Sequence, residues 1–297
     1  MKNPNVSVPI AARPHDDPGL DGGRRIKAQR AISALLSLSA LAFSGAALAA
    51  DSGDCESRIP ALLKAAYPDA VREADGKSLR LPVSSARWIK PDGVVCKVWP
   101  ASPDKTLLAV RLEQEKAADF YDSTADLELL VAETVSPKIT HRLLEPDALV
   151  SDAVRLIGMN LDTARYRLDE HTMAFGVSLT YSGSSRPNPF NSTDLSLYVL
   201  DGTKLRPVLR NLRVETYQGD WDTRCAGEFK QSKRTIAVGT GRGKGYADLT
   251  VTTTLSGSRN VPKGEECQEV DGGQSKSSRR LSYDGREYAV PADLRGL

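Results

Sequence analysis

The string with the strongest potential for chemistry runs from Gly219 to Cys225 and reads Gly-Asp-Trp-Asp-Thr-Arg-Cys. Two carboxylates, Asp220 and Asp222, flank Trp221 beside a cysteine. Asp-x-Asp-x-Thr is a phosphatase nucleophile motif when it follows an apolar parallel strand, but here Tyr-Gln-Gly precedes it within an all-β pattern. Calcium binding is the other interpretation, although no Asp/Asn-rich loop surrounds the pair. We favour a polar turn in which Trp221 packs on the end of a sheet.

A second candidate is the loop from Ser182 to Thr193, which is rich in Ser, Asn and Pro. Long loops on a rigid β body commonly carry binding residues. The side chains of Arg186, Asn188, Phe190 and Asn191 offer a cation, two amides and an aromatic ring, a set that suits a sugar or a peptide. The sequence therefore predicts ligand binding by this loop and by the Asp220–Asp222 turn.

Motifs for catalysis or phosphate binding are weak. The segment from Gly239 to Gly245 alternates glycine with other residues, but a phosphate-binding loop needs Gly-Lys-Ser/Thr and a following helix, so we predict a hairpin connection. The histidines after residue 49 are His141, in a strand, and His171, in a turn. The sequence contains neither a Gly-x-Ser-x-Gly elbow nor a His-Glu-x-x-His motif. A triad assembled in space stays open, and the alternative function is a hydrolase centred on His171 or on the Asp220/Asp222 pair.

Four cysteines follow the N-terminal region, at positions 55, 96, 225 and 267. An even number in an exported chain predicts two disulfides. Three pairings are open, and we favour Cys55–Cys96 and Cys225–Cys267 because each closes a local loop. A metal site is the alternative, but no Cys-x-x-Cys pair supports it. The sequence indicates no cofactor.

The N-terminal region has the pattern of an export signal. Residues 1–23 lack apolar periodicity and are interpreted as a disordered extension or an early start. Residues 24–49 form a basic segment, an apolar run and an Ala-Leu-Ala ending, which are the parts of a secretory signal peptide cleaved near Ala49/Ala50. The run is short for a membrane anchor. We therefore expect a periplasmic chain without a stable membrane anchor.

The net charge of residues 50–297 gives no support for nucleic acid as a partner. The whole chain has a formal charge of +2, but residues 1–49 hold six Lys/Arg and three Asp/Glu, which leaves 34 basic and 35 acidic residues and a charge of −1 in residues 50–297. A balanced charge does not favour nucleic acid. The expected partner is a periplasmic protein or a glycan.

The elements that must position these residues are mostly strands. The first, Cys55–Ala66, has apolar residues at helical spacing and predicts one short helix that ends at Tyr67-Pro68. Three later segments, at about 96–144, 164–215 and 226–256, follow one pattern of strand, connection and a second strand that begins with Asp. Their alternation with a period near two predicts half-buried antiparallel strands, and residues 50–297 are interpreted as one β-rich domain.

Such hairpins must pack together, because none buries its apolar face alone. The predicted fold class is all-β, an antiparallel β-repeat body built as propeller-like blades or as a β-sandwich, with one short N-terminal helix. The flanks Leu79–Trp99 and Arg280–Pro291 are also predicted as strands. A short helical turn is expected in Glu145–Asp152, and Pro207 predicts an edge strand or a bulge.

Three strings carry a resemblance: Lys97-Val-Trp-Pro-Ala-Ser-Pro-Asp-Lys-Thr-Leu-Leu-Ala-Val, Leu161-Asp-Thr-Ala-Arg-Tyr-Arg-Leu and Asp220-Trp-Asp-Thr-Arg-Cys-Ala-Gly-Glu-Phe. They resemble uncharacterised proteobacterial periplasmic proteins over most of residues 50–297. The resemblance implies export and names no activity, so no functional residue is carried over. The function expected from the sequence is binding or envelope maintenance without catalysis.

Overall fold

The computed structural model describes residues 55–82, 86–114 and 123–297. The chain divides into two units, residues 1–49 and residues 50–297, and the elements described below belong to the second. The predicted extension at 1–23 and the predicted signal at 24–49 lie outside the described residues.

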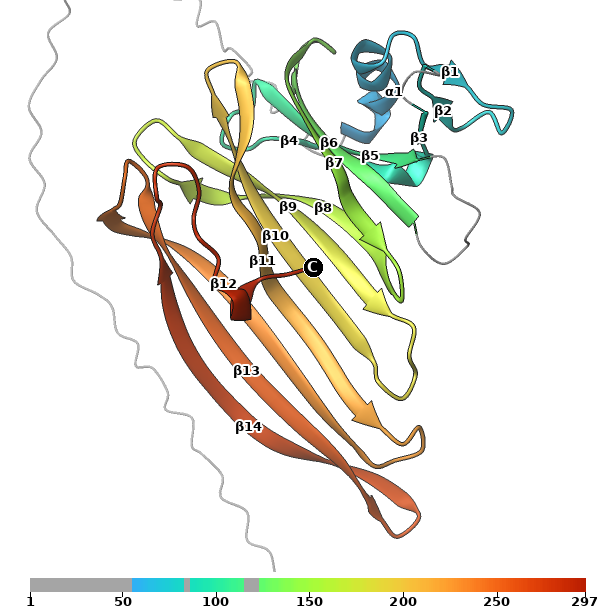
Figure 1. The fold of residues 1–297 in the computed structure, drawn as a ribbon, viewed down its shortest axis with the longest axis vertical. Coiled ribbons are helices and arrows are strands. Elements are labelled where there is room, and N and C mark those ends of the chain that lie inside the picture. Colours follow the sequence, from blue (N-terminus) through green and yellow to red (C-terminus); the bar gives the residue numbers. More distant parts are fainter. Residues whose placement is uncertain (1–54, 83–85, 115–122) are drawn as a thin grey trace, which may run out of the picture. The chain divides into compact units, whose positions relative to one another are not determined.

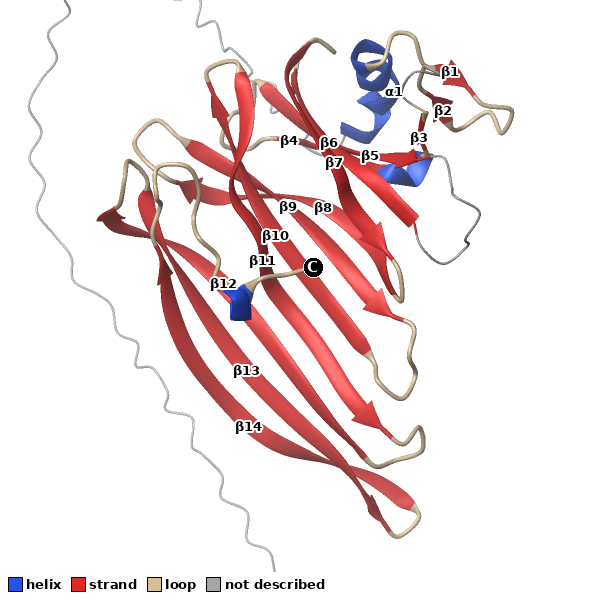
Figure 2. Cartoon of the chain, in the orientation of Figure 1, coloured by secondary structure: helices blue, strands red, loops and turns tan. Residues whose placement is uncertain are grey.

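The all-β fold class with one short helix is confirmed (Figures 1 and 2). Two seven-stranded antiparallel sheets form the body. The first, sheet A, has the order β1-β2-β3-β5-β6-β7 with β4 beside β5, and the second, sheet B, is a meander from β14 to β8. The elements are α1 Cys55–Ala66, β1 Val71–Arg72, β2 Leu79–Arg80, β3 Arg87–Ile89, η1 Pro91–Gly93, β4 Val94–Val98, β5 Lys105–Gln114, β6 Ser123–Glu133, β7 Ile139–Ser151, β8 Val154–Arg167, β9 Met173–Gly183, β10 Phe190–Asp201, β11 Lys204–Trp221, β12 Gly227–Arg242, β13 Ala247–Lys263, β14 Glu266–Leu281 and η2 Ala292–Leu294.

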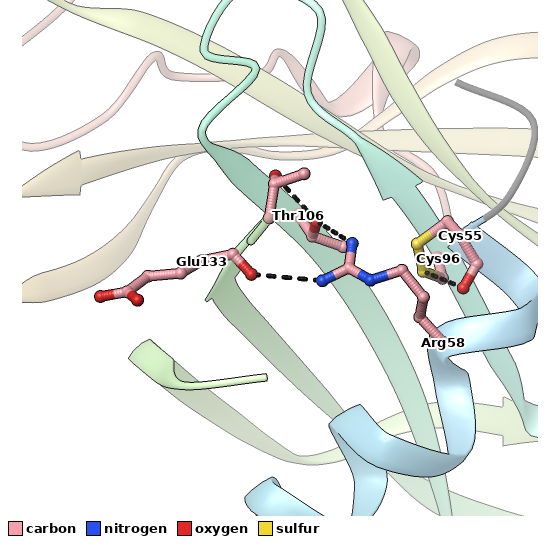
Figure 3. The surroundings of a disulfide bond; sticks show 6 residues. Cys55, Arg58, Cys96, Thr106 and Glu133 are labelled. Carbon is pink, nitrogen blue, oxygen red and sulfur yellow. Dashed lines mark hydrogen bonds between the residues drawn. A yellow bond between two sulfur atoms is a disulfide. The ribbon is translucent and has the colours of Figure 1, made fainter. Parts of the chain in front are cut away.

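Helix α1 has the bounds predicted from its apolar spacing. Leu62, Leu63 and Ala66 are buried and pack with apolar residues of β4, β5 and β6 in one core cluster. The Arg58 guanidinium reaches across to sheet A, where it donates to Thr106 Oγ1 (3.1 Å) and to the Glu133 carbonyl (3.4 Å; Figure 3). One face of sheet A is therefore covered by the helix.

Strands β5 and β6 are buried on both faces, which corrects the expectation of half-buried strands. Leu107 and Ala109 belong to the core shared with sheet B, whereas Leu108 and Val110 belong to the core under α1. Even Glu128 is only 4% exposed, because Tyr67 donates a hydrogen bond to it and Arg142 pairs with it at 3.1 Å. The Glu128 carboxylate therefore connects Tyr67, the residue after α1, to sheet A.

The two sheets share a core. Trp99 packs edge-on against Phe175 with ring centroids 5.5 Å apart, and Phe175 stacks on Tyr198 at 5.9 Å. The wholly buried Tyr198 donates to Glu145 Oε2 (2.7 Å), and Arg210 donates to Oε1 (2.6 Å). Burial and the neighbouring Glu145 carboxylate raise the pKa of Tyr198 well above its ordinary value. Both oxygens of Glu145 thus connect sheet A to sheet B.

The C-terminal segment covers the other core of sheet B, where Tyr283, Tyr288 and Leu294 are buried. Tyr288 Oη donates to the Ala247 carbonyl (2.6 Å), and the Leu297 N–H donates to Asp194 (2.7 Å). The strand predicted at Arg280–Pro291 is therefore wrong beyond Leu281, because the chain leaves the sheet edge there to fill the core.

In each of the three segments predicted to repeat, the two strands of the pattern pair as an antiparallel hairpin, β5–β6, β9–β10 and β12–β13. Leu112 opposes Asp126 and Leu179 opposes Asp194, so the first two hairpins share a register. The second strands begin before the aspartates that were predicted to start them, at Ser123, Phe190 and Ala247. Each of these aspartates is buried beside an arginine: Asp126 by Arg87 (2.7 Å), Asp194 by Arg213 (3.1 Å) and Asp248 by Arg280 (3.6 Å). The repeat itself stays a prediction.

Two local predictions have opposite outcomes. The helical turn expected in Glu145–Asp152 is wrong, since β7 continues to Ser151. A register shift there lets the Asp147 N–H, at φ +54°, donate to Asp126 (3.0 Å). The bulge expected near Pro207 is confirmed, since a register shift lies where Pro207 opposes Tyr198.

Candidate functional site

The two segments predicted to bind a ligand meet at one end of sheet B. The Trp221 N–H donates to the Pro187 carbonyl (2.8 Å) and the Gly219 N–H to the Pro189 carbonyl (3.0 Å), so the loop before β10 runs beside the end of β11. The Arg186 guanidinium lies over the Trp221 ring, 5.9 Å from its centroid, at the distance of a cation–π contact. The structure therefore joins Arg186 and Trp221, which are 35 positions apart.

A row of three aromatic rings continues from Trp221. Residues 217, 219 and 221 alternate onto one face of β11, and Phe229 of β12 lies opposite Gly219 on that face. The rings of Tyr217 and Phe229 stack with centroids 6.1 Å apart and an interplanar angle of 9°. We call Tyr217, Trp221 and Phe229 the aromatic face.

Two glycines make room for these rings. A Cβ at Gly219 would lie 2.5 Å from Phe229 Cδ1, and a Cβ at Gly227 would lie 3.0 Å from Trp221 Cδ1 and 3.1 Å from Phe229 Cζ. A larger residue at either position would displace a ring. The glycines thus leave the space that the Phe229 and Trp221 rings occupy.

Polar side chains continue this surface across β13 and β14. Tyr217 and Phe229 line a hollow of about 520 Å³. Ser258 lies opposite Phe229, and Asp271 lies opposite Ser258, so these groups share the face. The other lining residues are Lys230, Gln231, Ser256, Gly257 and Glu269. The surface thus combines flat rings with hydroxyl, amide and carboxylate groups.

The structure places the six predicted ligand-binding residues in different surroundings. Arg186 and Trp221 meet as described, and Asn188 is exposed in the same loop. Phe190 lies opposite Gln218 and Asp220 opposite Glu228, which places both on the reverse face. Asp222 forms the turn.

The Asp222 turn is a structural feature, as the favoured interpretation of this string expected. Its Oδ1 accepts the N–H groups of Arg224 and Cys225, both at 2.8 Å. These backbone hydrogen bonds hold the pKa of Asp222 below its ordinary value. The carboxylate is therefore committed to the turn, in which Thr223 adopts φ +66°.

Sequence reasoning missed Tyr217 and Phe229, together with the polar groups of β13 and β14. A signal was present: Tyr217-x-Gly-x-Trp221 places three positions on one strand face, and Gly227-x-Phe229 repeats the spacing after a tight turn. The polar groups carry no such signal, because they come from strands about 30 to 50 residues further along the chain.

Both favoured disulfides are confirmed. Cys55 pairs with Cys96 and Cys225 pairs with Cys267, with Cα–Cα distances of 5.8 and 5.5 Å. The first joins the start of α1 to β4 (Figure 3). The second joins the turn of the candidate site to the start of β14, so it fixes the end of the sheet that carries the aromatic face.

The two histidines of the described residues lie in unrelated places. The His141 ring bonds to Thr140 Oγ1 (2.9 Å) and to the Gly202 carbonyl (3.1 Å). His171 is exposed in the turn shaped by Asp169, which accepts its backbone N–H (2.7 Å). Among the described residues, no three His, Cys, Asp or Glu side chains gather in the way a metal ion requires.

The hairpin connection predicted at Gly239–Gly245 is confirmed in part: Gly239 to Arg242 still belong to β12, and the turn that joins β12 to β13 begins at Gly243. No helix among the described residues has the length and apolar character needed to span a membrane. No family model, curated protein or solved structure matches this chain.

Proposed function

We propose that this chain is an exported, non-catalytic binding protein of the bacterial periplasm that holds a glycan on its aromatic face. Two disulfides support the oxidising compartment, because such bonds persist mainly outside the cytosol. The N-terminal pattern of residues 24–49 supports export.

One observation carries the choice of ligand. Tyr217 and Phe229 present nearly parallel rings beside a hollow lined by hydroxyl, amide and carboxylate groups. A sugar ring has an apolar face of C–H groups and an edge of hydroxyls. An aromatic ring matches the first and polar side chains match the second. Arg186 over Trp221 extends the surface by one ring.

The site favours a flat ligand held from one side. The rings lie along a strand face, and the polar groups follow on the next two strands rather than above the rings. Such a surface suits several consecutive sugar units better than one enclosed sugar. Envelope maintenance, the broader role expected from the sequence, is consistent with glycan binding.

Affinity electrophoresis tests this proposal. The purified chain is run through gels cast with soluble β-glucan, α-glucan, xylan or mannan, and is separately sedimented with insoluble cell-wall glycan. We expect retardation or co-sedimentation with at least one glycan. The variants Trp221→Ala and Phe229→Ala should each weaken it about tenfold, since truncation of a central aromatic typically costs more than 1 kcal/mol.

Phe190→Ala is the matched control, because Phe190 is an aromatic residue at the same end of the sheet but on the reverse face. It should leave binding unchanged. The proposal fails if no glycan binds, or if Phe190→Ala weakens binding as much as the two aromatic-face variants while all three remain folded by circular dichroism.

A further inference from the structure

A second surface, far from the aromatic face in sequence, has the features of a ligand site. A groove of about 660 Å³ lies between α1, the β1–β2 hairpin and the Lys90–Val94 segment. This volume falls within the range of about 300–1,000 Å³ typical of small-molecule sites. The disulfide Cys55–Cys96 holds the start of α1, and with it one wall of the groove.

The floor of the groove is apolar. It consists of side chains that are buried or half-buried: Ile59, Leu63, Tyr67, Leu79, Ile89 and Val94. The only hydroxyl in this set belongs to Tyr67, and it already donates to Glu128. A polar ligand body, such as a sugar or a peptide backbone, would leave hydrogen-bonding groups unsatisfied against this floor, at a substantial cost in free energy.

The rim of the groove is cationic. Four basic side chains, Lys64, Arg72, Lys77 and Lys90, line it against the single carboxylate of Glu56. Lys90 also pairs with Glu113 at 3.5 Å, whereas Lys64 and Lys77 form no salt bridge among the described residues, although the Asp75 carboxylate interacts with the charge of Lys77. The groove therefore offers positive charge beside an apolar surface.

We infer that the groove binds the anion of a long-chain fatty acid, with its acyl chain on the apolar floor and its carboxylate at the lysine rim. The floor accepts methylene groups that need no hydrogen bond, and each one buried strengthens binding by up to about fourfold. The exposed ammonium groups of Lys64 and Lys77 supply charge to the head group. This inference does not depend on the proposed glycan site.

Isothermal titration of the delipidated, purified chain tests the inference, with octanoate, decanoate and dodecanoate below their micellar concentrations. We expect affinity to rise severalfold with each two-carbon step, and we expect dodecan-1-ol, which lacks the charge, to bind at least tenfold more weakly than dodecanoate. Equal binding of the alcohol, or no binding of any fatty acid, would overturn the inference.

Two variants locate the site. Lys64→Glu combined with Lys77→Glu should weaken dodecanoate binding at least tenfold, and Ala61→Trp should block the groove from an exposed position on α1. The control is Lys204→Glu combined with Lys276→Glu, which makes the same change in net charge at two exposed positions outside the groove. Binding that responds equally to both charge reversals would show a non-specific attraction, and binding unchanged by Ala61→Trp would place the ligand elsewhere; either result overturns the assignment.

Discussion

Sheet A and the far end of sheet B are built from the same kind of antiparallel strand but have opposite surroundings. In β6, eight consecutive residues are buried, because α1 covers one face and sheet B the other. In β14, fifteen of the sixteen residues are exposed. Apolar burial therefore dominates the stability of sheet A, whereas backbone pairing and a disulfide hold the far end of sheet B.

This difference separates stability from binding. A substitution in β6 should lower the free energy of unfolding, and it should reduce ligand binding only through loss of the folded state. A substitution on the aromatic face should alter binding while the fold persists, since its rings lie on an end of the sheet outside the three apolar cores.

The largest expected effect is in sheet A. Leu129→Ala, at a fully buried position, should lower the free energy of unfolding by about 2–5 kcal/mol, because it removes apolar contacts and leaves a cavity. Leu255→Ala on β13, where the side chain is 47% exposed, should cost less than about 0.5 kcal/mol. Urea denaturation of both variants measures the contrast, and equal losses would refute it.

The next effect concerns the second disulfide. Replacing Cys225 and Cys267 together with Ser should destabilise the protein by about 2–4 kcal/mol, because the bond closes a long loop of the unfolded chain. Amide hydrogen exchange followed by mass spectrometry should show faster exchange in β12–β14. Faster exchange in β5 and β6 instead would mean that the two regions are not separable.

A third effect concerns the buried Asp126. Its burial raises its pKa, but hydrogen bonds from Arg87, the Asp147 N–H and Gln114 outweigh this, so the pKa lies below its ordinary value. Asp126→Asn should cost about 1–3 kcal/mol at pH 7, since Arg87 loses its charged partner.

The pH dependence of this cost follows from the direction of the shift. A carboxyl with a lowered folded-state pKa stabilises the protein above its unfolded value of about 3.9, and loses that contribution as the pH falls through the lower folded value. The difference between the wild type and Asp126→Asn should therefore shrink below about pH 4. Urea denaturation at pH 7 and pH 3 measures it, and a difference that grows in acid would contradict the account.

A fourth and smaller effect on stability is expected on the aromatic face. Tyr217→Ala should lower the free energy of unfolding by about 1–2 kcal/mol, because it removes the pairing with Phe229 and part of a half-buried ring. It should nevertheless weaken glycan binding severalfold. Thermal unfolding and affinity electrophoresis of one preparation compare the two effects, and a large loss of stability would place Tyr217 among the core residues.

Much of this architecture could be predicted from the sequence, because it depends on local patterns. The apolar spacing of Ile59, Leu62 and Leu63 predicted α1 with its observed bounds, and the loop lengths between cysteines favoured the observed disulfides. The alternation of apolar and polar residues could not show that both faces of sheet A are covered, one by α1 and the other by sheet B. Alternation gives no sign that Glu128 of β6 is buried, because Tyr67 and Arg142 reach it from other elements.

The candidate site was predictable only in part. Arg186 and Trp221 were chosen from their residue types, and their contact depends on how the loop before β10 pairs with β11. Asp222 was chosen as a ligand-binding residue, but its turn occupies it. Tyr217 and Phe229 escaped notice because their stacking requires the register across the turn between β11 and β12.

The most direct test of the separation between a buried scaffold and a binding surface is amide hydrogen exchange of the intact chain, with and without the glycan that retards it most strongly. We predict slower exchange on glycan binding in β11, β12 and β13 around Tyr217, Phe229 and Ser258, with exchange in β5 and β6 unchanged. Protection confined to sheet A, or no protection at saturating glycan, would contradict the account.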